Sequence, residues 1–215
     1  MRNIIECREI QVGFKSGFTL LIDELIIPVQ AFFHLAGANG SGKSSLLKAV
    51  SGLLRLQKGW IRIKGEDISR EENWKQDTGI YLGEHHLPGF LTAREYLTLV
   101  CRLKNKSTDL IDEALRLNKL GLNELMGGTK LIRQFSQGMK VRLAILGAII
   151  ARPSLLILDE PFAHLDQAAQ EELRSLLFDF HQWGATILCT CHERELLEGL
   201  VTESATLDKG RILAQ

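Results

Sequence analysis

The eight residues at 37–44 have the types and the spacing of a phosphate-binding loop. They read Gly-Ala-Asn-Gly-Ser-Gly-Lys-Ser. Glycines let a backbone turn tightly, so that several N–H groups point at one anion. Lys43 adds a positive charge for the terminal phosphates, and the Ser44 hydroxyl is an oxygen ligand for Mg²⁺. The pattern predicts a site for ATP and its metal ion, formed by Gly37, Ala38, Asn39, Gly40, Ser41, Gly42, Lys43, Ser44 and Ser45.

The segments on either side of this loop argue against an ordinary glycine turn. The apolar residues 32–36 precede it and are expected to form a strand. Residues 43–54 follow it, with apolar side chains at helical spacing. A strand, a loop and a helix in this order direct the positive N-terminal end of the helix at the phosphates. A glycine-rich turn without a ligand is therefore disfavoured.

A second pair of chemically active residues, Asp159 and Glu160, follows the apolar segment 155–158. Such a segment is typical of a buried parallel strand, and α/β sheets bind ligands at the carboxyl ends of their strands. Asp159 is expected to hold Mg²⁺ through water, and Glu160 to act as the general base on the attacking water. The alternative is a strand end with two solvated acids, which the phosphate loop upstream disfavours.

The elements that must position these residues alternate between strand and helix patterns, with one helical interruption. Strands are expected between 4 and 35, at 60–64 and at 185–190. Helices are expected at roughly 93–104, opened by a capping box of Thr92 and Glu95, and at 108–120 and 137–151. The order predicts one α/β domain with an N-terminal antiparallel β region, a catalytic core at 1–85 and 152–215, and an inserted helical subdomain at 86–151.

Composition limits the possible partners. The chain has 215 residues, and its 26 basic residues balance 26 acidic ones. A net charge of zero gives no general attraction to nucleic acid. The N-terminus has no signal-peptide core, and the apolar stretch 143–150 is far shorter than the roughly 20 residues that span a bilayer. The four cysteines form no CxxC pair, which predicts reduced and mostly buried thiols.

Four further features, in this order along the chain, resemble those of ABC transporter ATP-binding subunits. Phe14 stands at the place of the aromatic residue that stacks on adenine. Residues 135–139, Phe-Ser-Gln-Gly-Met, resemble the ABC signature, residues 164–166 resemble the D-loop, and His192 resembles the switch histidine. The resemblance covers essentially the whole chain. It implies a P-loop NTPase of the ABC type with a RecA-like core, which binds and hydrolyses ATP with Mg²⁺.

The resemblance also implies a role for each matched residue. Two ATP-binding domains would pair head to tail, so that Ser136 and Gly138 contact the γ-phosphate of the ATP bound to the partner. His192 would contact the γ-phosphate and help place the water beside Glu160, and Asp166 would communicate between the two sites. The partners implied are a second ATP-binding subunit, identical or related, and a separate integral membrane permease. The chain would lie on the cytoplasmic face of the membrane, and no nucleic acid is expected as a partner.

Three motifs depart from the pattern of the family. Glu84 stands where a glutamine usually touches Mg²⁺, with His85 one register away. Gln137 and Met139 stand in the signature where glycine and glutamine are common, which is expected to weaken γ-phosphate contacts or slow hydrolysis. Phe14 replaces the more usual tyrosine and should still stack. The expected Mg²⁺ ligands are therefore Ser44, Glu84 and Asp159.

Other functions share part of this pattern. A soluble ABC ATPase acting in translation or DNA maintenance would carry the same motifs. Translation members usually have two such domains in one chain, however, and DNA members usually have long insertions. A small-molecule kinase with a P-loop is disfavoured by the signature and by His192.

Residues 81–97 resemble the corresponding stretch of the haem exporter of cytochrome c maturation and of ABC-2 type exporters, which points to export. Residues 87–90 either form part of a groove for a coupling helix of the permease or pack as an ordinary loop.

Overall fold

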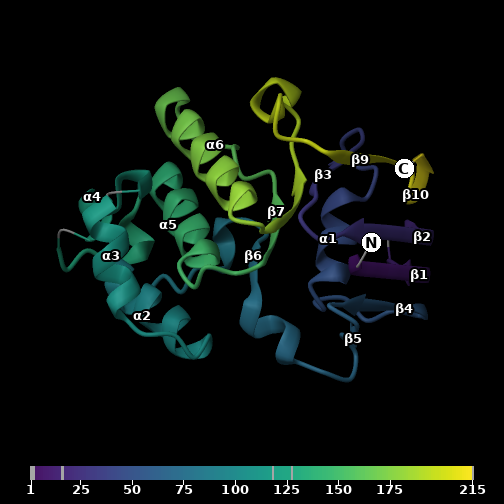
Figure 1. Ribbon diagram of the computed structural model, residues 1–215, viewed down its shortest axis with the longest axis horizontal. Coiled ribbons are helices and arrows are strands. Elements are labelled where there is room, and N and C mark those ends of the chain that lie inside the picture. Colours follow the sequence, from purple (N-terminus) through teal and green to yellow (C-terminus); the bar gives the residue numbers. More distant parts are fainter. Residues whose placement is uncertain (1–2, 16, 118, 127, 215) are drawn as a thin grey trace.

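The computed structural model describes residues 3–15, 17–117, 119–126 and 128–214. A group of helices lies at one end of the long axis and an antiparallel sheet at the other, with a larger sheet between them (Figure 1). The phosphate loop and the acid pair both lie at the carboxyl ends of strands in this central sheet.

The smaller sheet is antiparallel and has the strand order β2-β1-β4-β5. Its strands are β1 (Asn3–Gly13), β2 (Thr19–Pro28), β4 (Lys58–Ile63) and β5 (Glu66–Asp67). Buried and more exposed residues alternate along most of β2 and β4, as expected for strands with one face on the core. The predicted N-terminal antiparallel region is confirmed.

The central sheet has the order β10-β9-β3-β8-β7-β6. All of its neighbours pair in parallel except the terminal hairpin of β9 and β10. Its strands are β3 (Phe32–Ala36), β6 (Thr78–Tyr81), β7 (Leu155–Asp159), β8 (Thr186–Thr190), β9 (Glu203–Asp208) and β10 (Arg211–Ala214). Because neighbouring strands run in parallel, the residues after β3, β7 and β8 emerge at one edge.

Two hydrophobic cores cover the two faces of the central sheet. Leu156 and Leu158 of β7 face one core, whereas Leu155 and Ile157 face the other. This alternation follows from the two-residue repeat of a strand. The first core contains apolar residues of α2 (Ala93–Leu103), α3 (Asp109–Leu117), α5 (Gln137–Ile149) and α6 (Gln167–Gln182). The second contains those of α1 (Lys43–Val50) and of the antiparallel sheet. Both faces are buried, which explains why β3, β7 and β8 are almost uniformly apolar.

Several helices end earlier than the sequence predicts. The helix expected over 43–54 ends at Val50, and Gly52 follows with a φ of 70°. The helix expected over 108–120 ends at Leu117, because Leu120 adopts a left-handed φ of 53°. A short α4 (Leu122–Met126) follows instead. The helix expected over 137–151 ends at Ile149, and that over 93–104 ends at Leu103. The Thr92–Glu95 capping box is present as predicted.

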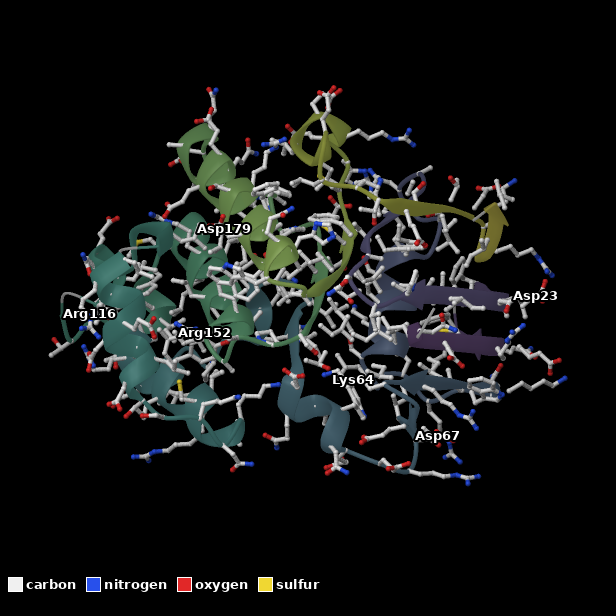
Figure 2. All side chains as sticks on the ribbon, viewed as in Figure 1. Asp23, Lys64, Asp67, Arg116, Arg152 and Asp179 are labelled. Carbon is white, nitrogen blue, oxygen red and sulfur yellow. The ribbon has the colours of Figure 1, made fainter. Side chains whose placement is uncertain are left out.

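The surface carries acidic and basic side chains on many elements, as the balanced composition implies (Figure 2). Labelled examples include Asp23 on β2, Arg116 on α3 and Asp179 on α6. All four cysteines are buried, which agrees with the prediction of mostly buried thiols. Within the described residues, no helix is long and apolar enough to cross a bilayer.

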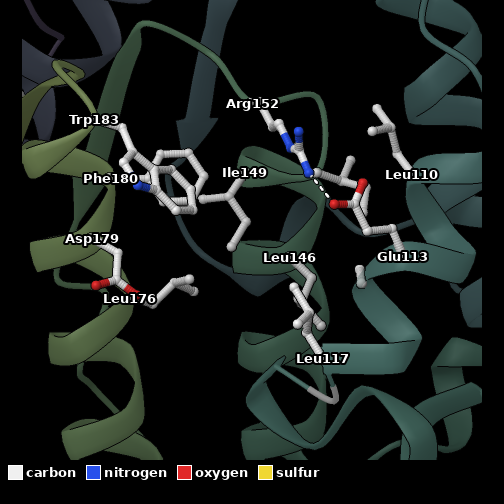
Figure 3. Close-up of a pocket in the computed structure, with 12 residues that line it drawn as sticks. Leu110, Glu113, Leu117, Leu146, Ile149, Arg152, Leu176, Asp179, Phe180 and Trp183 are labelled. Atoms are coloured by element: carbon white, nitrogen blue, oxygen red, sulfur yellow. Dashed lines mark hydrogen bonds and ion pairs between the residues drawn. The ribbon is translucent and has the colours of Figure 1, made fainter.

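An apolar cavity of about 280 Å³ lies where α3, α5 and α6 meet (Figure 3). Ile149 and Leu146 of α5 line it, and an ion pair between Arg152 and Glu113 lies at its edge. Trp183, at the end of α6, is 72% exposed and forms part of the wall. None of the residues singled out by the motifs lines this cavity, so it is separate from the site described next.

Candidate nucleotide-binding site

The loop at 37–44 has the backbone that its glycines permit. Gly37, Gly40 and Gly42 have φ values of 149°, 77° and 109°. A Cβ atom at Gly37 would lie 2.3 Å from the carbonyl oxygen of Leu207, so a side chain is excluded there. Lys43 Nζ donates hydrogen bonds to the carbonyl oxygens of Gly37 at 2.8 Å and Ala38 at 3.3 Å. The lysine thus folds back over the loop, with its ammonium group where phosphate oxygens would be received.

A cavity of about 340 Å³ opens over this loop and is lined by residues that are distant in sequence. Its lining consists of Phe14, Phe18, Asn39, Gly40, Gly42, Lys43, Ser44, Ser45, Glu160 and His192. The rings of Phe14 and Phe18 form one wall, with centroids 5.6 Å apart at an interplanar angle of 48°. Such a wall offers a stacking surface for a planar base. Phe18 was missed in the sequence, where its place after the Lys15 turn gave it no distinguishing signal.

Asp159 and Glu160 are held by Thr190, which the sequence reasoning also missed. The parallel strands β7 and β8 pair Asp159 with Thr190 in register. Thr190 Oγ1 donates to Asp159 Oδ1 at 2.8 Å and accepts from the Glu160 N–H at 2.9 Å. Thr190 is fully buried, and Glu160 has a φ of 49°. One hydroxyl therefore orients the Asp159 carboxylate and anchors the left-handed turn that presents Glu160. The only available signal was its position at the carboxyl end of a neighbouring apolar strand.

Glu160 and His192 face each other across the cavity entrance. The His192 N–H donates to Glu160 Oε2 at 3.1 Å, and His192 Nε2 lies 3.4 Å from Glu160 Oε1. The Glu160 Oε1 atom is buried, and none of the described residues, His192 included, forms a hydrogen bond with it. A buried carboxylate oxygen without a donor is costly, so it marks a position at which a water or ligand proton would be received.

His34 supports the turn that carries His192. His34 lies on β3 and is buried, and its Nε2 is 3.2 Å from the carbonyl oxygen of Cys191. A carbonyl oxygen only accepts, so His34 Nε2 carries the proton. Burial lowers the pKa of His34, and the hydrogen bond to Cys191 opposes that shift in part. The neutral imidazole is therefore the form that the fold selects.

Ser136 and Asp166 begin helices outside this cavity. Ser136 is the N-cap of α5, where its Oγ accepts from the Met139 N–H at 3.3 Å. Asp166 is the N-cap of α6, where its Oδ1 accepts from the Ala169 N–H at 2.8 Å. The described residues that line the cavity over the phosphate loop include neither Asp166 nor any of residues 136–138. The two helix starts are therefore free to meet a ligand other than the one bound in that cavity.

Glu84 does not line the cavity over the phosphate loop. It begins the 3₁₀ segment η2 (Glu84–His86), and its Oε1 accepts a hydrogen bond from Gln137 Nε2 at 2.8 Å. His85 Nδ1 lies 3.6 Å from the same oxygen. Both Glu84 and Gln137 line a second cavity of about 390 Å³ that includes Arg133 and Lys140. The predicted metal ligands Ser44 and Glu84 thus line different cavities in this structure.

The donors near the phosphate loop nevertheless fit Mg²⁺ bound together with a nucleotide. Ser44 lines the cavity, and Asp159 lies at the adjacent strand end with its carboxylate oriented by Thr190. Among the residues that the structure describes, no cluster of three or more His, Cys, Asp or Glu side chains could hold a metal by itself. Mg²⁺ keeps several waters and takes one or two protein oxygens plus phosphates, so a sparse set of hard oxygen donors suits it.

A glycine-rich loop between a parallel strand and a helix, with an acid pair at the end of a second parallel strand of the same sheet, defines a P-loop nucleoside triphosphatase. The family model described as ABC transporter matches residues 24–163. The chain therefore belongs to the ABC transporter family, as an ATP-binding subunit that hydrolyses ATP.

Individual proteins agree with this assignment. The thiamine import ATP-binding protein of Rhizobium meliloti is 30% identical over 95% of this chain and 86% of its own length. The solved structure of an ATP-binding subunit of an ABC transporter has a TM-score of 0.87 at 26% identity, covering 98% of this chain and 88% of that one. An ATP-binding cassette solved as a dimer with ADP and phosphate in a post-hydrolysis state has a TM-score of 0.82 at 20% identity, covering 97% and 96%. The predicted family and fold class are confirmed.

Proposed function

We propose that this chain drives transport by pairing with a second ATP-binding subunit and closing on ATP beneath a separate membrane permease. The carrying observation is that the site is divided. The phosphate loop, Glu160 and His192 line one cavity, whereas Ser136 and Asp166 begin helices outside it. A head-to-tail partner would bring its own signature helix to this cavity, and each subunit would complete the site of the other.

Within the cavity, the chain's residues divide the work of binding and hydrolysis. Residues 37–45 bind the phosphates with backbone N–H groups and with the Lys43 ammonium group. Phe14 stacks on the adenine. Ser44, Asp159 and, after a rearrangement, Glu84 would hold Mg²⁺, which when bound neutralises charge on the β- and γ-phosphates.

The chemical step is the attack of water on the γ-phosphorus. Glu160 takes a proton from the water, the new bond forms between the water oxygen and phosphorus, and the bond to the β,γ-bridging oxygen breaks. ADP leaves with the electrons of that bond. His192, 3.4 Å from Glu160 Oε1, holds the base in place and contacts the γ-phosphate. Across the interface, Ser136, Gln137 and Gly138 of one subunit would contact the γ-phosphate held by the other, and Asp166 would link the two sites.

The permease is proposed to dock at the cavity beside Glu84, at the junction of the core (1–85 and 152–215) with the helical subdomain (86–151). Leu87 and Ile132 give this cavity an apolar part, and Arg133 and Lys140 give it positive charge. Phe90, which follows the lining residue Gly89 in the chain, is 74% exposed. Such a surface suits an amphipathic helix from a membrane subunit, and we propose that the chain binds this helix on the cytoplasmic side of the membrane. We propose export as the direction, on the resemblance of residues 81–97, although a relative at 30% identity is an import protein.

Co-purification tests this function directly. Tagged protein carrying Glu160→Gln is expressed in its native cells, and membranes are solubilised in the presence of ATP. A stoichiometric polytopic membrane protein is expected in the purified complex, and its identity indicates direction and cargo. The matched control is Glu160→Gln combined with Lys43→Ala, which cannot hold ATP and should lose ATP-dependent partners. Recovery of ribosomes, DNA or soluble proteins alone would overturn the transporter role and favour a soluble ABC ATPase in translation or DNA maintenance.

A further inference from the structure

The hydrogen bond between Glu84 and Gln137 joins two positions at which this chain departs from the common pattern of its family. Gln137 Nε2 donates to Glu84 Oε1 at 2.8 Å across 53 residues of sequence. The Glu84 side chain is 12% exposed, whereas Gln137 lies on the surface. An acid at one position and an amide donor at the other form a charge-assisted pair, which neither departure would explain alone.

The backbone on both sides of this bond is fixed. Gly83, which precedes Glu84, has φ 101° and ψ 157°, a region open essentially to glycine alone. A Cβ atom there would lie 2.8 Å from His85 Nε2. Gln137 is the first residue of α5, and the Ser136 cap sets its position. The bond therefore directs the Glu84 carboxylate toward the start of α5.

This direction conflicts with the two roles proposed above. The Glu84 carboxylate is bonded to the start of α5 and does not line the cavity over the phosphate loop, which Ser44 lines. An amide that is bonded to Glu84 is likewise not available to the nucleotide of a partner subunit. The hydrogen bond between them must therefore break before either group can act in the role proposed above.

We propose that the Glu84–Gln137 hydrogen bond is a resting-state tether, which Mg²⁺ and ATP must release before the signature helix can engage a partner. The inference rests on the proposed role of Glu84 at Mg²⁺. In the resting subunit, the carboxylate is held by its own signature helix. When ATP and Mg²⁺ bind, Glu84 turns to the metal, and Gln137 is freed for the second subunit. Because coupling free energies are reciprocal, a variant without the tether should bind Mg²⁺–ATP more tightly.

Nucleotide binding by the monomeric subunit isolates this effect. Each protein carries Glu160→Gln to prevent turnover and is kept at a concentration at which light scattering shows a monomer. No partner signature is then present, so Gln137 can influence the nucleotide only through its own chain. A fluorescent ATP analogue is titrated with Mg²⁺, and the Mg²⁺ concentration for half-maximal binding is measured. The variants are Gln137→Ala, Glu84→Ala, both together, and Gln182→Ala, which removes an exposed glutamine from the far end of α6.

The expected result is that Gln137→Ala lowers the half-saturating Mg²⁺ concentration by about threefold to tenfold, the range for an exposed charge-assisted hydrogen bond. Glu84→Ala should raise it, the double variant should match Glu84→Ala, and Gln182→Ala should change nothing. An unchanged value for Gln137→Ala, beside a raised value for Glu84→Ala, would overturn the tether and leave the metal role standing. A Gln137→Ala effect that persists without Glu84 would also overturn the tether. No effect of Glu84→Ala would instead overturn the metal role itself.

Discussion

The hydroxyl of Thr190 donates a hydrogen bond to Asp159 Oδ1 at 2.8 Å and accepts one from the next residue along, the Glu160 N–H, at 2.9 Å. One buried side chain thus fixes both the carboxylate of Asp159, which is expected to hold Mg²⁺, and the backbone of Glu160, which is the expected base. The in-register pairing of β7 with β8 makes this possible, because it places Thr190 directly opposite Asp159. Positioning of the two acids is therefore a property of the central sheet rather than of the loop that follows β7.

Replacing Thr190 by valine tests this positioning role. The shape of the side chain is kept, but the Glu160 N–H and the Asp159 carboxylate each lose a partner. The free energy of unfolding should fall by about 1–3 kcal/mol, the usual cost of a buried polar group left unpaired. The kcat for ATP hydrolysis should fall by at least about tenfold with a smaller change in KM, because misplacement affects the reaction more than ground-state binding. Steady-state kinetics and urea unfolding measure both.

The conservative variant Thr190→Ser supplies the control for this prediction. It keeps the hydroxyl and loses only a methyl group, so most of the kcat should return. If the valine and serine variants lose the same kcat, packing rather than hydrogen bonding explains the effect, and the positioning role is wrong.

Replacing Glu160 by glutamine should separate binding from hydrolysis. The amide has the shape of the carboxylate but cannot take a proton from water, so turnover should fall by about 10²–10⁴-fold. Nucleotide affinity should remain, and the ATP-bound protein should accumulate as a dimer by size-exclusion chromatography. Glu195→Gln is the matched control, because Glu195 is exposed and does not line the nucleotide cavity. Turnover near the wild-type value in Glu160→Gln would show that another group acts as the base.

The sequence predicted the parts of the site that depend on local pattern. The glycines at 37–42 and the apolar strand before Asp159 each determine a local geometry, so the P-loop and the acid pair were placed correctly at the sheet edge. Strand β6 and helix α6 were not identified. β6 has only four residues, and one of them is Gly79, so the pattern was too short to mark a strand.

The features that the sequence did not predict arise from contacts between distant segments. Thr190 and Phe18 matter only because β8 lies beside β7 and because Phe18 turns back onto Phe14. Glu84 was placed at the metal from the motif alone, yet it is bonded to Gln137, 53 residues away. No periodicity or spacing reports such a contact, since the hydrogen bond depends on how η2 packs against the start of α5.

The aromatic wall of the nucleotide cavity predicts an effect on affinity. Phe14→Ala removes one stacking surface and should weaken ATP binding by about 5–150-fold, which corresponds to the usual 1–3 kcal/mol for a stacked base. Phe14→Tyr should bind ATP within about threefold of wild type, because the ring is kept. The dissociation constants are measured by titration of a fluorescent ATP analogue. Phe178→Ala, which removes an exposed phenylalanine on α6, is the control. Equal affinities of wild type and Phe14→Ala would exclude stacking.

His34 predicts a pH dependence of stability. Burial lowers its pKa in the folded chain below the ordinary value of 6.5, so the native state favours the neutral ring. Above pH 6.5 both the folded and the unfolded states hold neutral His34, and its contribution to stability is complete. As the pH falls below 6.5, the unfolded chain takes up a proton that the folded chain does not. The free energy of unfolding then decreases, by at most about 1.4 kcal/mol per pH unit for one proton, until the folded pKa is reached.

Urea unfolding between pH 5 and 8 measures this slope. His34→Gln keeps a donor for the Cys191 carbonyl but has no proton to gain, so the curve should flatten between pH 5 and 6.5. His86→Gln, the same change at an exposed histidine, is the matched control. Because His34 supports the residue before His192, His34→Ala should in addition lower kcat, whereas His34→Gln should largely keep it. A wild-type slope retained in His34→Gln would assign the pH dependence to another group, and it would leave the Cys191 contact as His34's only role.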